Sequence, residues 1–430
     1  MFPKQDIYRL LINHEEEARA CRDLPESACR EVPRNFFLQL ISQVMTSLGD
    51  LLINPKTVLA WLLGAVGAPG LVAWLVPVRE SGSMVPQIVI GAWMRRRPVR
   101  KFFWVGGSLG QALCVLGMAA SVWLLSGLWA GLSILACLVA FSLARGFCSV
   151  AQKDVLGKTI PKGRRGRLTG IATTVSGLLV VLFSLLLFRD QGEPSLTFYL
   201  TLLVVAAVLW ILAGWLFACI DEQPGETGGG VNALGEAFGN LRLVRDDLLF
   251  RRFVIARGLL LSSALVAPYL VVLAQQQSPG AWLLGVFMVA SSLGSAVSAL
   301  IWGLMADQSS RRVMLWGGIM ASAVSLLVGA VSLGAQEPSA LVWFYPAAFL
   351  VLSIAHAGIR LGRKTYLVDM AGGNKRTDYT AVSNTLIGVL LLVMGGLTAL
   401  VSLLSVSAVV IFLGVMGVLG TLMTAQLREV

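Results

Sequence analysis

Ten long apolar runs dominate the pattern of hydrophobic and polar positions along the chain. They lie near 102–125, 127–149, 168–188, 197–219, 253–275, 282–305, 313–334, 340–359, 379–403 and 405–426. An α-helix that crosses the hydrocarbon core of a membrane needs about 20 mainly apolar residues. The pattern therefore predicts at least ten membrane-spanning helices.

The stretch from 36 to 94 is harder to interpret, because four charged residues interrupt its apolar runs: Asp50, Lys56, Arg79 and Glu80. Hydropathy alone predicts a single span at 57–77. That interpretation leaves the two charges at 79 and 80 in a loop.

An internal repeat favours a different interpretation of this stretch. A shift of the chain by 212 positions aligns FWVG at 103–106 with LWGG at 315–318. Carried back toward the N-terminus, the repeat predicts two further spans at about 39–63 and 70–94, which contain all four charges. The fold class is therefore an all-α membrane protein with twelve transmembrane helices in two sets of six.

Composition and charge agree with a membrane protein and indicate its orientation. Hydrophobic residues make up 56% of the 430 residues and charged residues only 13%, whereas soluble domains are about 25% charged. The net charge is +11, but 29 of the 34 Lys and Arg fall in segments on one side of the predicted topology. Cytoplasmic loops retain these residues. Both termini are therefore expected in the cytoplasm, with the loop at 64–70 outside, and no nucleic-acid partner is needed to explain the charge.

The span count divides the chain into four segments. Residues 1–35 are expected to form a cytoplasmic N-terminal extension, 36–219 and 251–430 the two six-helix bundles, and 220–250 a cytoplasmic linker. The linker contains PGETGGG at 224–230, which is typical of a flexible connection. We expect an integral protein of the plasma membrane, the inner membrane in a bacterium, that is a monomer in the lipid bilayer.

Three loops resemble those of the major facilitator superfamily. The segment 303–312 reads GLMADQSSRR, similar to the family signature G-x-x-x-D-x-x-x-R-[RK] between spans eight and nine. Its counterpart between spans two and three, GAWMRRRPVRK at 91–101, keeps the glycine and the basic pair but has Arg95 in place of the acid. The segment from Asp154 to Gly166 is similar to the family's loop between spans four and five.

The resemblance implies two six-helix bundles that face each other across a central cavity and rock to expose a midplane site to either side. Parallel repeats with a substrate site between them are a recurring transporter design. The resemblance therefore implies a secondary active transporter, or permease, for a small organic solute. An anionic solute is one of the options. The alternative is a protein of this fold that no longer transports and acts as a membrane sensor or assembly partner.

The resemblance also implies a conformational latch that stabilises one of the two rocked states. By residue match, Gly303, Asp307, Arg311 and Arg312 would form it in the C-terminal half. The degenerate N-terminal copy, with Arg95, leaves two interpretations open: a second latch, or basic residues that only anchor the loop on the cytoplasmic side.

The four charges of spans one and two are the main candidates for a substrate or proton-coupling site. At a rise of about 1.5 Å per residue their depths in the membrane overlap. Arg79 and Glu80 point about 100° apart on a helix, so Asp50 is expected to pair with Arg79 and Lys56 with Glu80. Two interpretations remain: a structural clamp between the spans, or a cavity wall in which a carboxyl exchanges a proton and a cation holds an anionic substrate.

Other polar residues in the spans carry weaker signals. Arg257 in span seven is a further candidate for substrate binding, although its side chain has the length to reach the cytoplasmic interface instead. Arg145 is expected to be an interfacial anchor, and His356 a hydrogen-bonded packing residue. Asn54 and Pro55 are expected to weaken span one locally.

Motifs for catalysis or cofactor binding are missing from the sequence. It has no metal-ligand spacing, no phosphate-binding glycine loop and only two histidines, His14 and His356. We therefore expect a protein that is not an enzyme and has no cofactor or metal site. An ATP-driven pump is disfavoured, and the intramembrane carboxylates make protons the expected coupling ion.

Overall fold

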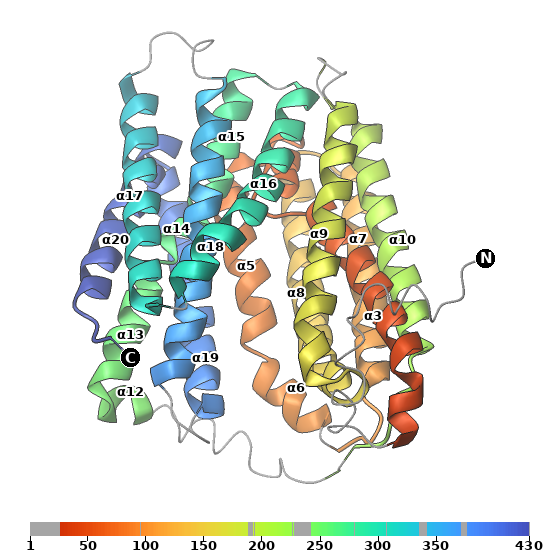
Figure 1. The fold of residues 1–430 in the computed structure, drawn as a ribbon. Coiled ribbons are helices and arrows are strands. Elements are labelled where there is room, and N and C mark those ends of the chain that lie inside the picture. Colours follow the sequence, from red (N-terminus) through yellow and green to blue (C-terminus); the bar gives the residue numbers. More distant parts are fainter. Residues whose placement is uncertain are drawn as a thin grey trace.

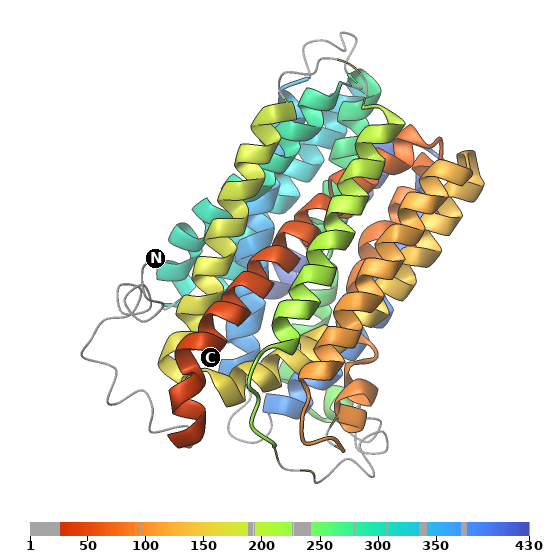
Figure 2. The ribbon, with the colours of Figure 1, turned by 90° about the vertical axis from the view of Figure 1, so that its right-hand side faces the viewer.

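The computed structural model describes residues 26–94, 96–187, 192, 194–225, 227, 242–278, 280–306, 308–334, 342–370 and 376–429. Within these ranges every regular element is a helix. The long helices run side by side along one direction, as both views of the ribbon show (Figures 1 and 2). The expectation of an all-α protein is confirmed.

All ten clear apolar runs form helices long and apolar enough to cross a membrane. They are α7 (Lys101–Leu124), α8 (Gly127–Thr159), α9 (Lys162–Leu187), α10 (Leu196–Ala218), the series α13 (Leu248–Leu259), α14 (Ser262–Leu265) and α15 (Ala267–Gln277), α16 (Ala281–Ala306), α17 (Ser310–Gly334), α18 (Phe344–Met370), α19 (Arg376–Ser402) and α20 (Val406–Ala425). A short helix, α12 (Leu243–Asp246), precedes α13. Both α8 and α18 continue well beyond the predicted ends at 149 and 359, and those two predicted ends are wrong.

The stretch from 36 to 94 forms four α-helices and one turn of 3₁₀ helix. They are α3 (Glu26–Leu52), α4 (Val58–Ala65), the 3₁₀ turn Pro69–Leu71, α5 (Val72–Met84) and α6 (Gln87–Met94). Arg79 and Glu80 lie inside α5, as the repeat predicts for these two residues, and not in the loop that the single span at 57–77 leaves for them. The prediction of two continuous helices is wrong, because both are broken.

Pro55 breaks the first span, because it has no backbone N–H and its ring clashes with the preceding turn. The Asn54 carbonyl instead accepts a hydrogen bond from the Leu59 N–H at 3.0 Å. The Asn54 side chain accepts another from the Lys56 N–H at 2.8 Å. The helix is therefore interrupted completely at the predicted weak point, and Lys56 lies in the turn between α3 and α4.

The two repeats pack in the same way. In the first, α7 packs against α8 and α10, and in the second, α17 packs against α18 and α20. The two halves of the chain meet where α5 packs against α19, α9 against α16, and α4 against α15. In Figure 1 the first half lies to the right and most of the second half to the left, with α5 and α16 near the middle.

The outer helix surfaces expose large apolar side chains. Examples are Leu113, Trp129 and Leu182, which are 70%, 73% and 61% exposed. A soluble monomer rarely leaves such an extended apolar surface in water. Lipid tails are the natural environment for these side chains, in agreement with the span assignment.

The register of the first two spans predicts a pattern of chemical labelling. In a cysteine-free background, a thiol introduced by Gly70→Cys should react readily with a membrane-impermeant reagent added from outside, because Gly70 is exposed with open space around it. A thiol introduced by Ser81→Cys should react poorly, because Ser81 is only 3% exposed within α5. Equal labelling of both positions from outside would contradict the register.

Candidate functional site

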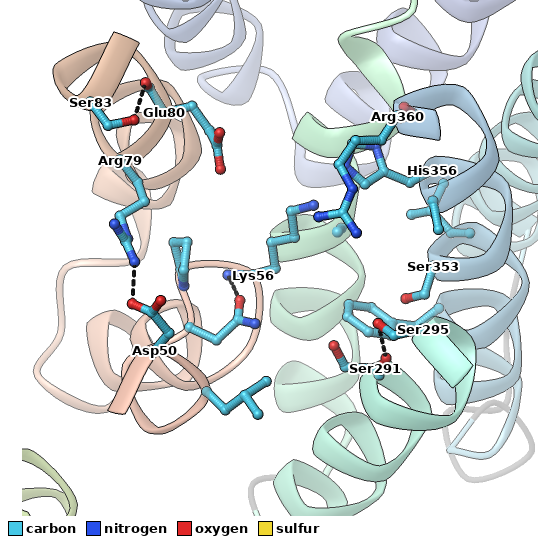
Figure 3. Close-up of a pocket in the computed structure, with 18 of the residues that line it drawn as sticks. Asp50, Lys56, Arg79, Glu80, Ser83, Ser291, Ser295, Ser353, His356 and Arg360 are labelled. Carbon is cyan, nitrogen blue, oxygen red and sulfur yellow. Dashed lines mark hydrogen bonds and ion pairs between the residues drawn. The ribbon is translucent and has the colours of Figure 1, made fainter. Parts of the chain in front are cut away.

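A cavity of about 410 Å³ lies between the two halves of the chain (Figure 3). This volume is within the range of small-molecule pockets, about 300–1,000 Å³. Residues of α3, α5 and α8 line one side, and residues of α14, α15, α16 and α18 line the other. The charged or titratable lining residues are Asp50, Lys56, Arg79, Glu80, Arg145, His356 and Arg360.

Asp50 holds two arginines of the first half in place. Its carboxylate accepts a hydrogen bond from Arg79 Nη2 at 2.6 Å and two from Arg145 Nη1 at 2.5 and 2.6 Å. The guanidinium of Arg79 also lies over the Phe141 ring, 4.5 Å from its centroid. The predicted pair between Asp50 and Arg79 is confirmed.

Arg145 is not the interfacial anchor that the sequence predicted. The residue lies within α8, which continues for several turns beyond it. Its side chain borders the cavity and binds Asp50, and 36% of it is exposed. The expectation failed because the apolar run ends soon after Arg145 whereas the helix does not.

The second predicted ion pair does not form. Among the described residues, Lys56 and Glu80 make no ion pair with each other or with any other side chain. Figure 3 shows the Lys56 side chain extending toward α18, where Arg360 and His356 lie, and the Glu80 carboxylate pointing into the cavity. The interruption after α3 explains the difference, since the turn at Asn54 redirects the residue that follows Pro55.

One face of α18 supplies the opposite wall. Ser353, His356, Ala357 and Arg360 follow the spacing of residues that share one side of an α-helix. His356 Nδ1 lies 3.0 Å from Ser263 Oγ, so its expected hydrogen bond is confirmed and its ring also borders the cavity. Arg360 was missed because the predicted span ended one residue before it, although its spacing from His356 was a usable signal.

Positive charge exceeds negative charge in the cavity. Four cationic side chains line it, against the two carboxylates of Asp50 and Glu80. An uncompensated charge in a low-dielectric site is costly, so such groups normally face a counter-ion or a water-filled cavity. The arrangement is suited to an anion that enters from solution.

Arg257 lies outside this cavity and is buried among protein side chains. The side chain is only 5% exposed. Its Nη1 donates to Ser383 Oγ at 2.5 Å and its Nη2 to Asn384 Oδ1 at 2.9 Å, both on α19. The structure therefore shows Arg257 joining α13 to α19 through neutral groups.

The predicted latch residues are only partly visible. Asp307 lies outside the described residues, as does Arg95 of the N-terminal copy. Arg311 Nε binds Glu429 Oε1 at 2.9 Å, and Arg312 lies 4.0 Å from the same carboxylate. Partial burial alone would raise the pKa of Glu429, but hydrogen bonds from Ser309 and Arg311 lower it below its usual value.

Two acids hold the basic loop between α6 and α7. Asp154 on α8 forms ion pairs with Arg100 and, at 2.8 Å, with Lys158. Lys158 also pairs with Glu222 at 3.0 Å, and Glu222 accepts a hydrogen bond from the Lys101 N–H at 2.6 Å. Arg100 and Lys101, at the end of this loop, are therefore held against α8 and against the residues that follow α10.

The fold is similar to that of several solved transporters. The nucleoside transporter NupG (D323A mutant) aligns with a TM-score of 0.69 at 10% identity, covering 91% of this chain and 99% of that one. The inward-open xylose transporter XylE from E. coli aligns at 0.68 and 13% identity, over 92% and 97%. A POT family transporter in complex with a thioalcohol-conjugated peptide aligns at 0.63 and 14% identity, over 94% and 98%.

These likenesses show the fold, which this chain shares with the three solved transporters, and the predicted transporter fold is confirmed. The ten apolar helices and this fold identify an integral membrane protein. No protein-family model matches the chain. Uncharacterized proteins of Mycobacterium tuberculosis and Mycobacterium bovis are 23% identical over 377 residues, which cover 84% of this chain and 71% of theirs.

Proposed function

We propose that this chain is a secondary active transporter of the major facilitator superfamily that moves a small anionic organic solute by alternating access, coupled to protons. The observation that carries the proposal is the cavity between the halves, lined by four cationic and two acidic side chains. A site between two repeats is where such transporters hold substrate. A transport role requires no enzymatic step, cofactor or metal.

Alternating access requires contacts that differ between the two states. One contact between the halves joins α4 to α15, where the Gln275 side chain donates a hydrogen bond to the Trp61 carbonyl at 3.0 Å. Gly64 lies directly against it, since a Cβ there would be 2.1 Å from Gln275 Oε1. We assign this contact to the external end, where it would have to open for solute to pass.

Glu80 is the proposed proton carrier. Its carboxylate lines the cavity and makes no ion pair among the described residues. Lys56 lies close enough to interact with it electrostatically. A solute anion that binds Lys56 brings a further negative charge next to Glu80, and a proton taken up there relieves the repulsion, so binding of solute and of a proton would support each other.

The remaining architecture is proposed from the repeat. Twelve spans form two six-helix bundles at 36–219 and 251–430, after a cytoplasmic extension at 1–35 and joined by a cytoplasmic linker at 220–250. The protein is a monomer in the plasma membrane, the inner membrane of a bacterium, with both termini in the cytoplasm. Gly303, Asp307, Arg311 and Arg312 form the conformational latch.

Uptake into proteoliposomes tests the proposal. Vesicles containing the purified protein, with a more acidic medium outside, are incubated with a mixture of small organic acids, washed and extracted for mass spectrometry. At least one anion should accumulate above its external concentration, and a protonophore should abolish the accumulation. If no solute enters faster than into protein-free vesicles, the non-transporting sensor or assembly partner is the better interpretation.

A further inference from the structure

The cavity has two separate positions where positive charge exceeds negative charge. The first is at Asp50, whose single carboxylate is shared by Arg79 and Arg145. Arg79 is buried, with 6% exposed, whereas 36% of the Arg145 side chain remains exposed beside the cavity. Two guanidinium groups therefore share one ion-paired carboxylate at this position, and Arg145 is the group accessible to a ligand.

The second position lies across the cavity, between the two halves. Lys56 extends from the turn after α3 toward Arg360 on α18 (Figure 3). Neither cation has an ion-pair partner among the described residues, and the second carboxylate of the cavity wall, Glu80, interacts electrostatically with Arg79 and Arg145 as well as with Lys56. Arg363, one turn further along α18, is also close enough to interact with Lys56 electrostatically. At least one further positive charge is uncompensated here.

From these two positions we infer that the transported solute is a small dicarboxylate, with one carboxylate bound between Lys56 and Arg360 and the other bound by Arg145. The inference rests on the proposed function and specifies its substrate class. A monocarboxylate would neutralise only one position. A phosphate monoester carries both charges on a single group and would likewise leave one position empty. Arginine suits a carboxylate because its planar guanidinium donates paired hydrogen bonds.

Each of the two cationic positions that would bind a solute carboxylate can be removed without leaving a buried protein carboxylate unpaired. Arg145→Gln keeps Asp50 paired with Arg79, and Lys56→Gln removes a cation that has no ion-pair partner. Arg251→Gln is the matched control, because Arg251 is an exposed arginine near the N-terminal end of α13 and does not line the cavity.

Equilibrium binding to the purified full-length protein tests the inference by calorimetry. The probes are dicarboxylates from malonate to adipate, each with its monoamide and diamide of nearly equal size, and glycerol 3-phosphate. At least one dicarboxylate should bind about tenfold or more tightly than its monoamide, the difference expected for loss of one charged hydrogen-bonding group. Arg145→Gln and Lys56→Gln should each remove most of this preference, whereas Arg251→Gln should keep it.

Three results would overturn the inference: no dicarboxylate binds more tightly than its monoamide, glycerol 3-phosphate binds more tightly than every dicarboxylate, or the preference survives both cavity variants. Failure of the proposed function would give a different combination of transport and binding results. Proteoliposomes that transport only neutral or monoanionic solutes keep the transporter and reject the dicarboxylate. Dicarboxylate binding with the expected variant pattern, but no transport of any solute, keeps the binding site and rejects the transporter.

Discussion

Glu80→Gln is expected to abolish uphill transport driven by a pH gradient while exchange between equal solute concentrations continues. The amide is nearly isosteric with the carboxyl but can neither load nor release a proton. Glu80 also makes no ion pair among the described residues, so its replacement breaks no buried pair. Uptake and counterflow of one labelled solute, measured in the same proteoliposome preparation, distinguish the two activities.

Glu80→Asp is the matched control, because it keeps a titratable carboxyl at the same position and should retain part of the uphill transport. The neighbouring carboxylate provides a second comparison. If the Gln variant at position 80 still accumulates solute, and an Asp50→Asn variant loses accumulation but keeps exchange between equal solute concentrations, Asp50 is the proton carrier. If both variants accumulate solute normally, neither carboxylate carries the coupled proton.

Asp50→Asn is expected to lower the stability of the fold substantially. The change leaves buried Arg79 without its counter-ion while Arg145 stays nearby. Removal of one partner of a buried ion pair typically costs about 3–5 kcal/mol. The midpoint of thermal unfolding in detergent should therefore fall clearly below that of the unmodified protein.

A double variant separates this electrostatic cause from a packing defect. Adding Arg79→Gln to Asp50→Asn removes the stranded charge, so the double variant should unfold at a higher temperature than Asp50→Asn alone. A double variant that is less stable than both single variants would show that packing around Arg79, including its contact with Phe141, outweighs the charge.

Much of the fold was predictable from the sequence because membrane spans are encoded by composition. Every clear apolar run is a helix, since backbone groups in a bilayer must be paired within their own segment. The repeat also placed Arg79 and Glu80 inside a helix where hydropathy did not. Once both charges were in the span, helix geometry was sufficient to predict the pair between Asp50 and Arg79.

The errors in the candidate site have a common physical origin. Hydropathy detects the side chains that contact lipid. A residue that faces an internal cavity can be charged without marking the end of its helix. Arg145 was therefore predicted to be an interfacial anchor and Arg360 fell outside its predicted span, although α8 and α18 extend beyond them. The pair between Lys56 and Glu80 failed for a different reason: the main-chain interruption at Pro55 changes the direction of the next side chain.

Simultaneous measurement of solute and proton movement in the same vesicles tests the central claim most directly. Proteoliposomes that contain a trapped pH indicator receive a labelled dicarboxylate from outside, with no initial pH difference across the membrane. Entry of the solute should acidify the interior, and the Glu80→Gln variant should exchange solute without this acidification. Entry of solute with no change in internal pH in the unmodified protein would contradict proton coupling through this cavity.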